Sequence, residues 1–370
     1  MEKFKSAIIG HTRKGDFGHR LDKTFENFPD VETVAVVDFN PKGIEGQKKN
    51  FPEAEFYTNV EEMLYNHDVT LLTICQRNPS TRLDIFKSCK GKSIKGIICE
   101  KPLAVTTKEA NEILEICDQS NISLVVAHRR ANPYESYARE LIKTGKIGDL
   151  ITIKSRGKCD QRSGGEDLAV LGIHMMDSMR YMVGCEVKSV NAKILKKSKK
   201  IVPSDIHYGN EGIGLVAGDT VFANYLFENG VMGMFESYPI KTTVEKHSSF
   251  FGFEVYGSTG ILCVRNSPLG EMSYLDDCVW ISEPTKNNWK KIQIQSWDKI
   301  ASEKRTSASN EILADALLTK LRTGHVNENV SWGYDAFKAT EMIGATLKSA
   351  VINSEVELPL GDLENPYLNW

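Results

Sequence analysis

No run of about 18 apolar residues occurs anywhere in the sequence, so no segment is long enough to cross a bilayer as a helix. The N-terminal stretch also lacks the long apolar core and the small-residue cleavage site of a signal peptide. The eight cysteines are scattered, and none forms a Cys-x-x-Cys pair. These absences predict a cytoplasmic protein with reduced, buried thiols and no membrane partner.

The signs of a nucleic-acid or metal-binding protein are missing as well. The net charge is −3, whereas nucleic-acid binders carry a basic excess, so the run Lys196–Lys200 is interpreted as a solvated loop. No residues have metal-ligand spacing, and no Gly-x-Ser-x-Gly nucleophile motif occurs. With 41% hydrophobic and 26% charged residues, the chain has the composition of a globular protein, and its 370 residues suggest two domains or one large one.

The first third of the chain alternates strand-like apolar runs with helical patterns. The expected strands are Ser6–Ile9, Val31–Val37, Val69–Ile74, Ile94–Cys99 and Ile122–Ala127. The expected helices are Gly18–Asn27, Lys42–Asn50, Val60–Asn66, Thr81–Cys89 and Lys108–Gln119. This alternation predicts a doubly wound parallel sheet over residues 1–128, with helices covering both faces.

After about residue 130 strands follow one another directly, which predicts an α+β domain over residues 129–370 with an antiparallel or mixed sheet. Asn229-Gly230 is a hairpin signal between two of these strands. The expected helices are Pro133–Thr144, Gly172–Met182, Asn310–Thr323 and Trp332–Ser349. The expected strands are Leu150–Arg156, Val187–Ile194, Thr220–Phe227, Val231–Ser237, Phe250–Tyr256, Gly260–Arg265, Cys278–Ile281 and Trp289–Ile294.

The turn after the first strand is rich in glycine. Gly15 and Gly18 have the spacing of the second and third glycines of a dinucleotide-binding loop, but Gly10 lies three residues earlier than usual. A phosphate would meet the helix N-terminus near Gly18. Asp16 would repel it unless that side chain caps the helix, and Arg13 and Lys14 could compensate for the charge. The alternative is a strand-to-helix loop with no ligand.

Two further acidic positions fit the same kind of site. Asp38 ends the second strand about 20 residues after Gly18, where an acid bonds the adenosine ribose of NAD and disfavours NADP. The alternative is a strand-end Asp that opens a turn. Glu100-Lys101-Pro102 follows Ile94–Cys99 at the ligand-binding edge of the sheet, where a lysine can help to move the proton of a reacting hydroxyl. Taken alone, this tripeptide is also typical of a solvated turn.

More motifs follow in a fixed order along the chain. They are Arg130 with Asn132-Pro133, Gly164-Gly165, Gly172-Ile-His174-Met-Met-Asp177, Glu254-Val-Tyr-Gly257-Ser-Thr-Gly260 and Glu355-Val-Glu-Leu-Pro359. Together with the glycine loop, Asp38 and the stretch from Glu100 to Ala104, they resemble the glucose–fructose oxidoreductase / inositol dehydrogenase family (Gfo/Idh/MocA). The resemblance runs nearly from end to end of the chain.

The resemblance implies an N-terminal Rossmann domain and a C-terminal substrate-binding and oligomerisation domain with a large, mostly antiparallel sheet. It implies NAD or NADP, of which Asp38 makes NADP the less favoured, and hydride exchange with a secondary alcohol of a sugar, polyol or sugar acid, in a homodimer or homotetramer. Lys101 would contact the substrate hydroxyl, and His174 would be the acid/base. The implied cofactor-binding residues are Gly10, Thr12, Arg13, Gly15, Gly18, Asp38, Glu100 and Lys101, and the substrate-binding candidates are Arg130 and Asp177.

Besides the altered spacing of the glycine loop, the chain departs from the family at two places. Val170 stands where an acid often precedes the histidine, so either Glu166 or Asp167 replaces it, or the acid is dispensable, or activity is lost. Arg82 stands where the family commonly has a histidine; with Arg77 it could favour a carboxylate-bearing substrate, or be solvated. Two alternative functions follow: a sugar-processing enzyme that uses tightly bound NAD transiently, and a non-catalytic NAD-binding regulatory protein.

Overall fold

The computed structural model describes residues 3–240, 251–265, 271–277 and 289–370. The chain divides into two compact units. The first contains Met1–Ala131, Glu211–Ile213 and Glu303–Phe337, and the second contains Asn132–Asn210, Gly214–Ser302 and Lys338–Trp370. The first unit therefore extends beyond the expected range 1–128, because a late segment of the chain folds with it.

The first unit is built on a seven-stranded sheet with the order β18-β6-β5-β4-β1-β2-β3. All neighbours are parallel except β18, which runs antiparallel to β6. The strand order reverses between β1 and β4, which is where doubly wound folds bind ligands. All five expected strands are confirmed, and β3 and β18 are additions. The bounds are β1 (Phe4–Gly10), β2 (Val31–Asp38), β3 (Glu55–Tyr57), β4 (Leu71–Ile74), β5 (Gly96–Cys99), β6 (Ser123–Val126) and β18 (Ser331–Trp332).

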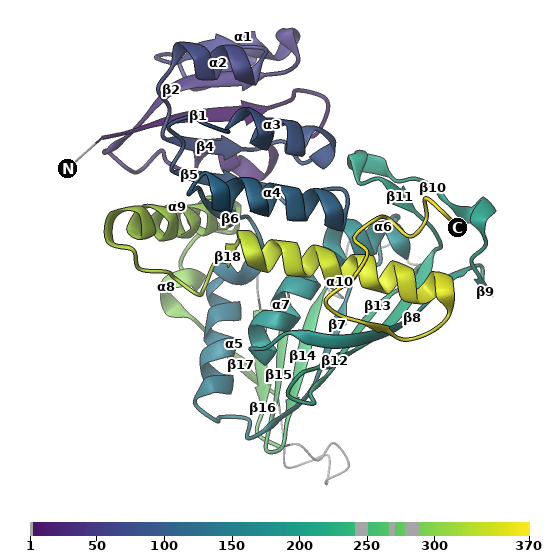
Figure 1. Ribbon diagram of the computed structural model, residues 1–370. Helices are drawn as coiled ribbons and strands as arrows, with labels where there is room; N and C mark the ends of the chain where they lie inside the picture. Colours follow the sequence, from purple (N-terminus) through teal and green to yellow (C-terminus); the bar gives the residue numbers. More distant parts are fainter. Residues whose placement is uncertain (1–2, 241–250, 266–270, 278–288) are drawn as a thin grey trace. The chain divides into compact units, whose positions relative to one another are not determined.

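Helices cover both faces of this sheet, as predicted (Figure 1). One face is packed by α2 (Val60–Asn66), α3 (Arg82–Ser88) and α4 (Thr107–Gln119), which bury residues such as Met63, Phe86 and Ile113. The other face is packed by α9 (Arg305–Thr323). The short α1 (Ile44–Asn50) follows β2.

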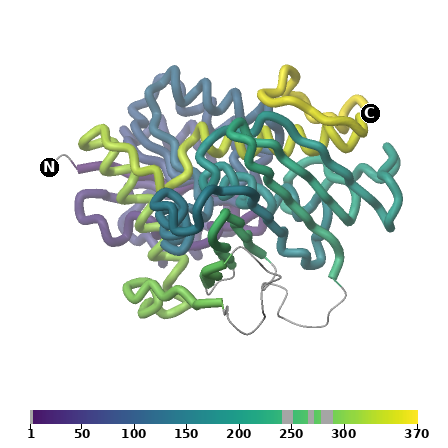
Figure 2. The backbone as a smooth tube through the Cα atoms, turned by 90° about the horizontal axis from the view of Figure 1, so that it is seen from below, coloured from purple at the N-terminus to yellow at the C-terminus, as the bar shows by residue number. Residues whose placement is uncertain are grey.

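The helix expected over Gly18–Asn27 does not form. A six-residue 3-10 helix, η1 (Gly18–Lys23), replaces it, and His19 and Arg20 have left-handed backbones with φ of 50° and 56°. The reason lies far along the chain, because α9 covers this part of the sheet and contacts η1. Figure 2 shows the yellow-green segment around α9 running beside the purple N-terminal part.

The second unit is built on a ten-stranded sheet, β17-β16-β15-β14-β7-β13-β12-β8-β19, with β9 paired to β8. Among the described strands, only β7 and β13 pair in parallel, and the Asn229-Gly230 hairpin joins β12 to β13 as predicted. The strand expected at Cys278–Ile281 lies outside the described residues. The bounds are β7 (Leu150–Arg156), β8 (Val187–Lys196), β9 (Lys199–Lys200), β12 (Thr220–Phe227), β13 (Met232–Ser237), β14 (Gly252–Gly257), β15 (Ile261–Arg265), β16 (Glu271–Leu275), β17 (Lys290–Ile292) and β19 (Val356–Glu357).

Helices pack against one face of this sheet. Every residue of α7 (Ile173–Val183) is buried, and Tyr225 on β12 shares a 2.7 Å hydrogen bond with Thr346 on α10 (Gly333–Ile352). None of the helices in the described ranges has the length and hydropathy that a bilayer crossing requires. The remaining elements are α5 (Pro133–Lys143), α6 (Gly165–Asp167), the π-helix η5 (Leu168–Gly172), α8 (Gln295–Asp298), β10 (His207–Tyr208) and β11 (Leu215–Val216).

Candidate active site

The glycine loop is folded tightly onto the segment that follows β4. A Cβ on Gly15 would lie 2.6 Å from the backbone nitrogen of Asn78, and one on Gly18 would lie 2.5 Å from Cγ of Arg77. The Gly18 N–H donates to the Cys75 carbonyl at 3.0 Å. Gly18 therefore permits the close packing that the third glycine of a dinucleotide loop provides.

Asp38 is completely buried at the base of this loop. Its Oδ1 accepts the backbone N–H groups of Thr12 and Asn40, each at 2.9 Å, and its Oδ2 accepts the Thr12 hydroxyl at 2.6 Å. A Cβ on Gly43 would lie 1.9 Å from Oδ2, so the start of the next helix closes over the carboxylate. In this structure Asp38 is occupied in holding the loop and is not presented to a ribose.

Asp16 turns back onto its own loop. Its Oδ1 accepts the N–H of Arg13 at 2.7 Å, and Arg13 is exposed with a left-handed backbone of φ 73°. Asp16 thus caps a loop turn and not a helix, and Arg13 faces solvent at the loop tip. Gly10 makes room for a ring, since a Cβ there would lie 2.5 Å from the Phe17 side chain.

Glu100 links the glycine loop to Lys101. Its buried carboxylate pairs through Oε1 with Nδ1 of His19, and Oε2 accepts the Lys101 N–H at 2.8 Å. Burial alone would raise the pKa of Glu100, but the charges of His19, Lys101 and Arg82 outweigh it and lower that pKa. Glu100 is therefore ionised at neutral pH. The Lys101 side chain is also buried, at 8% exposure.

Arg82 is neither solvated nor open to a substrate, which corrects both expectations. It is 1% exposed, and its guanidinium donates to the carbonyls of Gln76, Glu100 and Pro102. These three carbonyls follow β4 and β5, so Arg82 ties the two strand ends together on either side of Lys101. Arg77 bonds the loop instead, from Nε to the Gly15 carbonyl at 3.3 Å.

The remaining candidates lie as follows. In the first unit, Arg130 is 5% exposed and pairs with Asp335 at 3.1 Å. In the second unit, His174 and Asp177 lie one turn apart on α7 and are 6% and 0% exposed, so both side chains are buried. The His174 ring centroid is 6.3 Å from that of Phe251.

The acid missing at Val170 is not supplied by Asp167. Asp167 is fully buried and accepts the Ser237 hydroxyl at 2.6 Å and the Cys159 N–H at 2.9 Å, and burial raises its pKa. It fastens the turn before α7 to the sheet. Glu166 accepts from Asn210 at 2.9 Å, also within the second unit.

Three polar side chains at the sheet edge were not predicted as site residues from the sequence. Nδ1 of His11 and Oε1 of Gln76 are buried and have no hydrogen-bond partner among the described residues, and His19 is bound to Glu100. His11 follows β1 and Gln76 follows β4, the two strands at which the order reverses. Buried polar atoms without partners at this point fit the polar groups of a nucleotide cofactor. The only sequence signal was their position directly after a strand or a glycine.

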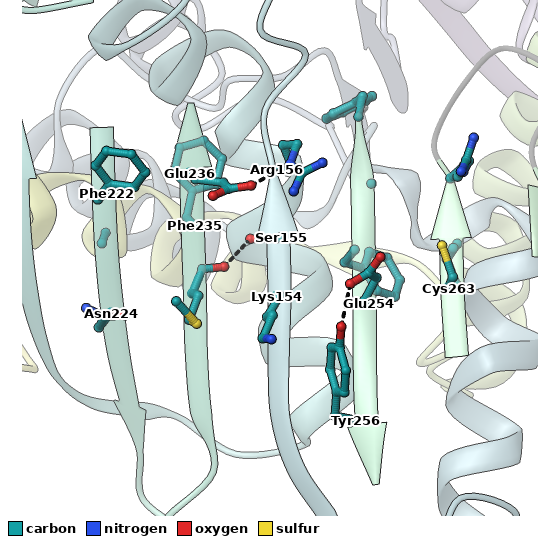
Figure 3. Close-up of a pocket in the computed structure, with 17 residues that line it drawn as sticks. Lys154, Ser155, Arg156, Phe222, Asn224, Phe235, Glu236, Glu254, Tyr256 and Cys263 are labelled. Atoms are coloured by element: carbon teal, nitrogen blue, oxygen red, sulfur yellow. Dashed lines mark hydrogen bonds and ion pairs between the residues drawn. The ribbon is translucent and has the colours of Figure 1, made fainter. Parts of the chain in front are cut away.

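A cavity of about 570 Å³ lies elsewhere, on the outer face of the second unit's sheet (Figure 3). Lys154 and Arg156 of β7 lie beside Glu236 and Glu254 there, and Arg156 bonds Glu236 at 2.5 Å. None of the residues expected to bind cofactor or substrate lines it. The described part of the chain holds no group of three or more His, Cys, Asp or Glu side chains suited to a metal ion.

Two family models match the chain. Residues 4–128 match an oxidoreductase family with an NAD-binding Rossmann fold, and residues 136–263 match the GFO/IDH/MocA C-terminal domain. An uncharacterized oxidoreductase of Bacillus subtilis is 24% identical over 71% of this chain and 75% of its own length. D-glucoside 3-dehydrogenase of Escherichia coli is 27% identical, and the alignment spans 52% of this chain and 57% of that protein.

Solved structures share the fold. Levoglucosan dehydrogenase in complex with NADH and levoglucosan has a TM-score of 0.74 at 18% identity, with 97% of this chain and 100% of that chain covered. An oxidoreductase from Agrobacterium radiobacter in complex with NAD⁺, L-tartaric acid and magnesium has a TM-score of 0.71 at 17% identity, with 96% and 98% covered. At these identities the likeness is one of fold alone.

Proposed function

Because the chain belongs to the Gfo/Idh/MocA family of NAD-binding oxidoreductases, we propose that it exchanges a hydride between NAD and a secondary hydroxyl or keto group of a sugar, polyol or sugar derivative. The observation that carries the proposal is the buried Glu100-Lys101 pair beside the glycine loop, at the edge where the strand order reverses. Relatives named as dehydrogenases of a glucoside, of levoglucosan and of myo-inositol support this substrate class. Their names favour net hydride exchange over the transient-redox and regulatory alternatives.

The cofactor, when bound, accepts or returns the hydride. The chain must hold the reacting oxygen and move its proton. Lys101 would donate a hydrogen bond to that oxygen and polarise it, and Arg82 and Glu100 fix the backbone on either side of the lysine. His174 would take the hydroxyl proton during oxidation and return it during reduction, since imidazole titrates near neutrality. Asp177, one turn away on α7, would orient the imidazole, and Arg130 would hold a polar group of the substrate.

Steady-state NADH formation with a panel of sugars and polyols tests the proposal. Lys101→Met and His174→Gln should each lower kcat by about 10²- to 10⁴-fold, the range of lost acid–base catalysis. The matched controls are Lys90→Met and His207→Gln, because both side chains are exposed and lie outside the proposed site. If Lys101→Met and His174→Gln keep full turnover on a substrate that the wild type oxidises, these roles are wrong.

We also propose that the outer face of the second unit's sheet joins copies of the chain into homodimers or homotetramers. Phe222, Met232 and Met234 on that face are 44%, 41% and 42% exposed among the described residues. They lie among side chains of both charge signs, which suits a self-complementary contact between identical surfaces.

The seven described cysteines are free thiols, in keeping with a cytoplasmic location.

A further inference from the structure

Two features that usually bind a dinucleotide are altered in the first unit. Pyrophosphate normally sits at the N-terminus of the helix after the first strand, and an acid after the second strand normally bonds the adenosine ribose. Here η1 has only six residues with a left-handed kink, and Asp38 is buried under Thr12 and the turn at Gly43. Phosphate recognition therefore needs another donor.

His19 is held at two points, one on its backbone and one on its ring. Its carbonyl accepts the Asn310 side-chain N–H at 3.0 Å, and its left-handed backbone turns the ring toward the sheet edge. Its Nδ1 pairs with Glu100, whose side chain is only 2% exposed, while the His19 side chain is 53% exposed. One ring nitrogen is thus anchored, and Nε2 has no hydrogen bond to any described residue.

The chemistry of this pair suits an anion. An ionised carboxylate at Nδ1 compensates the charge of a protonated imidazole, and that imidazole then offers the N–H of Nε2 to a phosphate oxygen. The exposed Arg13 and Arg20 add positive charge on the same loop. The unpartnered polar atoms of His11 and Gln76 mark the same edge of the sheet as a place for a polar ligand.

We propose that His19 donates from Nε2 to a phosphate oxygen of the bound dinucleotide, with Glu100 as its positioning residue. The pair takes over the task that a helix N-terminus performs in an ordinary dinucleotide loop. This inference rests on the proposed NAD-dependent function and adds a specific phosphate contact to it.

Calorimetric titration of the full chain with ADP-ribose and with adenosine tests this contact. The two probes differ in the pyrophosphate and the second ribose, so a variant that loses a phosphate contact should bind ADP-ribose more weakly and adenosine as well as before. His19→Gln should weaken ADP-ribose binding about tenfold, as expected for loss of one charge-assisted hydrogen bond. Glu100→Gln should weaken it less, because the imidazole remains but loses its charged partner. His207→Gln, at an exposed histidine of the second unit, is the control.

The outcomes separate the inference from the function on which it rests. The phosphate contact is wrong, while NAD binding stands, if His19→Gln binds ADP-ribose as tightly as the wild type. It is also wrong if the variant loses affinity for ADP-ribose and for adenosine equally. If the wild type binds neither NAD nor ADP-ribose, the proposed function itself fails. His19→Arg keeps a cationic donor and should bind ADP-ribose more tightly than His19→Gln; equal losses in both variants would mean that His19 only shapes the loop. Thermal unfolding of each variant identifies any that does not fold.

Discussion

The carboxylate of the fully buried Asp38 accepts a hydrogen bond of 2.6 Å from the hydroxyl of Thr12 at the base of the glycine loop. The same carboxylate accepts the Thr12 N–H, so both donors of this residue end on one side chain. The two positions predicted from the sequence as cofactor contacts are thus bound to each other. This arrangement makes the loop's shape depend on Asp38.

Removal of the Thr12 hydroxyl should therefore destabilise the first unit. Thr12→Val has nearly the same shape but leaves Oδ2 of Asp38 buried without its donor, which we expect to lower the free energy of unfolding by about 1–3 kcal/mol. Urea denaturation measures this difference. The control is Thr58→Val at an exposed position, which should stay within about 0.5 kcal/mol of the wild type. Equal stabilities of the two variants would contradict a loop held by Thr12.

Asp38→Asn should alter cofactor choice only slightly. The buried carboxylate has three hydrogen bonds within the chain, so its charge is not available to discriminate between a ribose hydroxyl and a phosphate. We expect the ratio of NAD to NADP affinities to change by less than about threefold, or under ~1 kcal/mol, in titrations of the variant. A shift of more than about tenfold toward NADP would restore the ribose role predicted from the sequence.

The strands of both units could be predicted from the sequence because short runs of β-branched and other apolar residues are typical of buried strands. The helix expected after Gly18 failed because its periodic pattern is local, whereas the structure there is set by α9, which packs against η1. The left-handed backbones of His19 and Arg20 leave no trace in hydrophobic periodicity. Only the tertiary partner explains them.

The candidate site was predictable where chemistry follows a motif, as at Glu100 and Lys101. It was not predictable where the partners are backbone groups that only the fold assembles. From the sequence Arg82 looks like a solvated helix residue, but in the structure its guanidinium donates to carbonyls that follow β4 and β5. Asp167 likewise resembles a catalytic acid in the sequence, but in the structure its carboxylate accepts hydrogen bonds from the Ser237 hydroxyl and the Cys159 N–H.

Ionisation of Glu100 should make the free energy of unfolding depend on pH in the acid range. The pKa of its carboxyl is lower in the folded chain than the ordinary 4.5, so its ionisation stabilises the fold above that pH. This contribution is lost as the pH falls through the folded-state pKa. We expect the stability difference between the wild type and Glu100→Gln to shrink in denaturation curves as the pH falls below about 4.5. Parallel curves over this interval would contradict an ionised Glu100 stabilised by His19, Lys101 and Arg82.

The sheet face proposed as an interface can be tested at Phe222. A charge at this 44% exposed ring would have to be desolvated in any contact between copies, so Phe222→Asp should shift the molar mass in light scattering toward the monomer. Its unfolding free energy should change little, because the ring is not part of the core. Tyr208→Asp, at an 81% exposed residue of β10, should leave the mass unchanged. A Phe222→Asp protein with the wild-type oligomeric mass would place the interface elsewhere.

Arg82 should act on turnover through Lys101. Arg82→Lys cannot reach all three carbonyls, so those after β5 lose the donor that fixes the backbone around Lys101. We expect kcat to fall about tenfold or more, because small misplacements of a reacting group are costly, while the Kd for NAD changes less than about threefold. Arg77→Lys, at a side chain 40% exposed whose Nε bonds the Gly15 carbonyl, should leave kcat nearly unchanged. A parallel loss of kcat and NAD affinity in Arg82→Lys would instead indicate general unfolding of the strand ends, and an unchanged kcat would remove Arg82 from the positioning of Lys101.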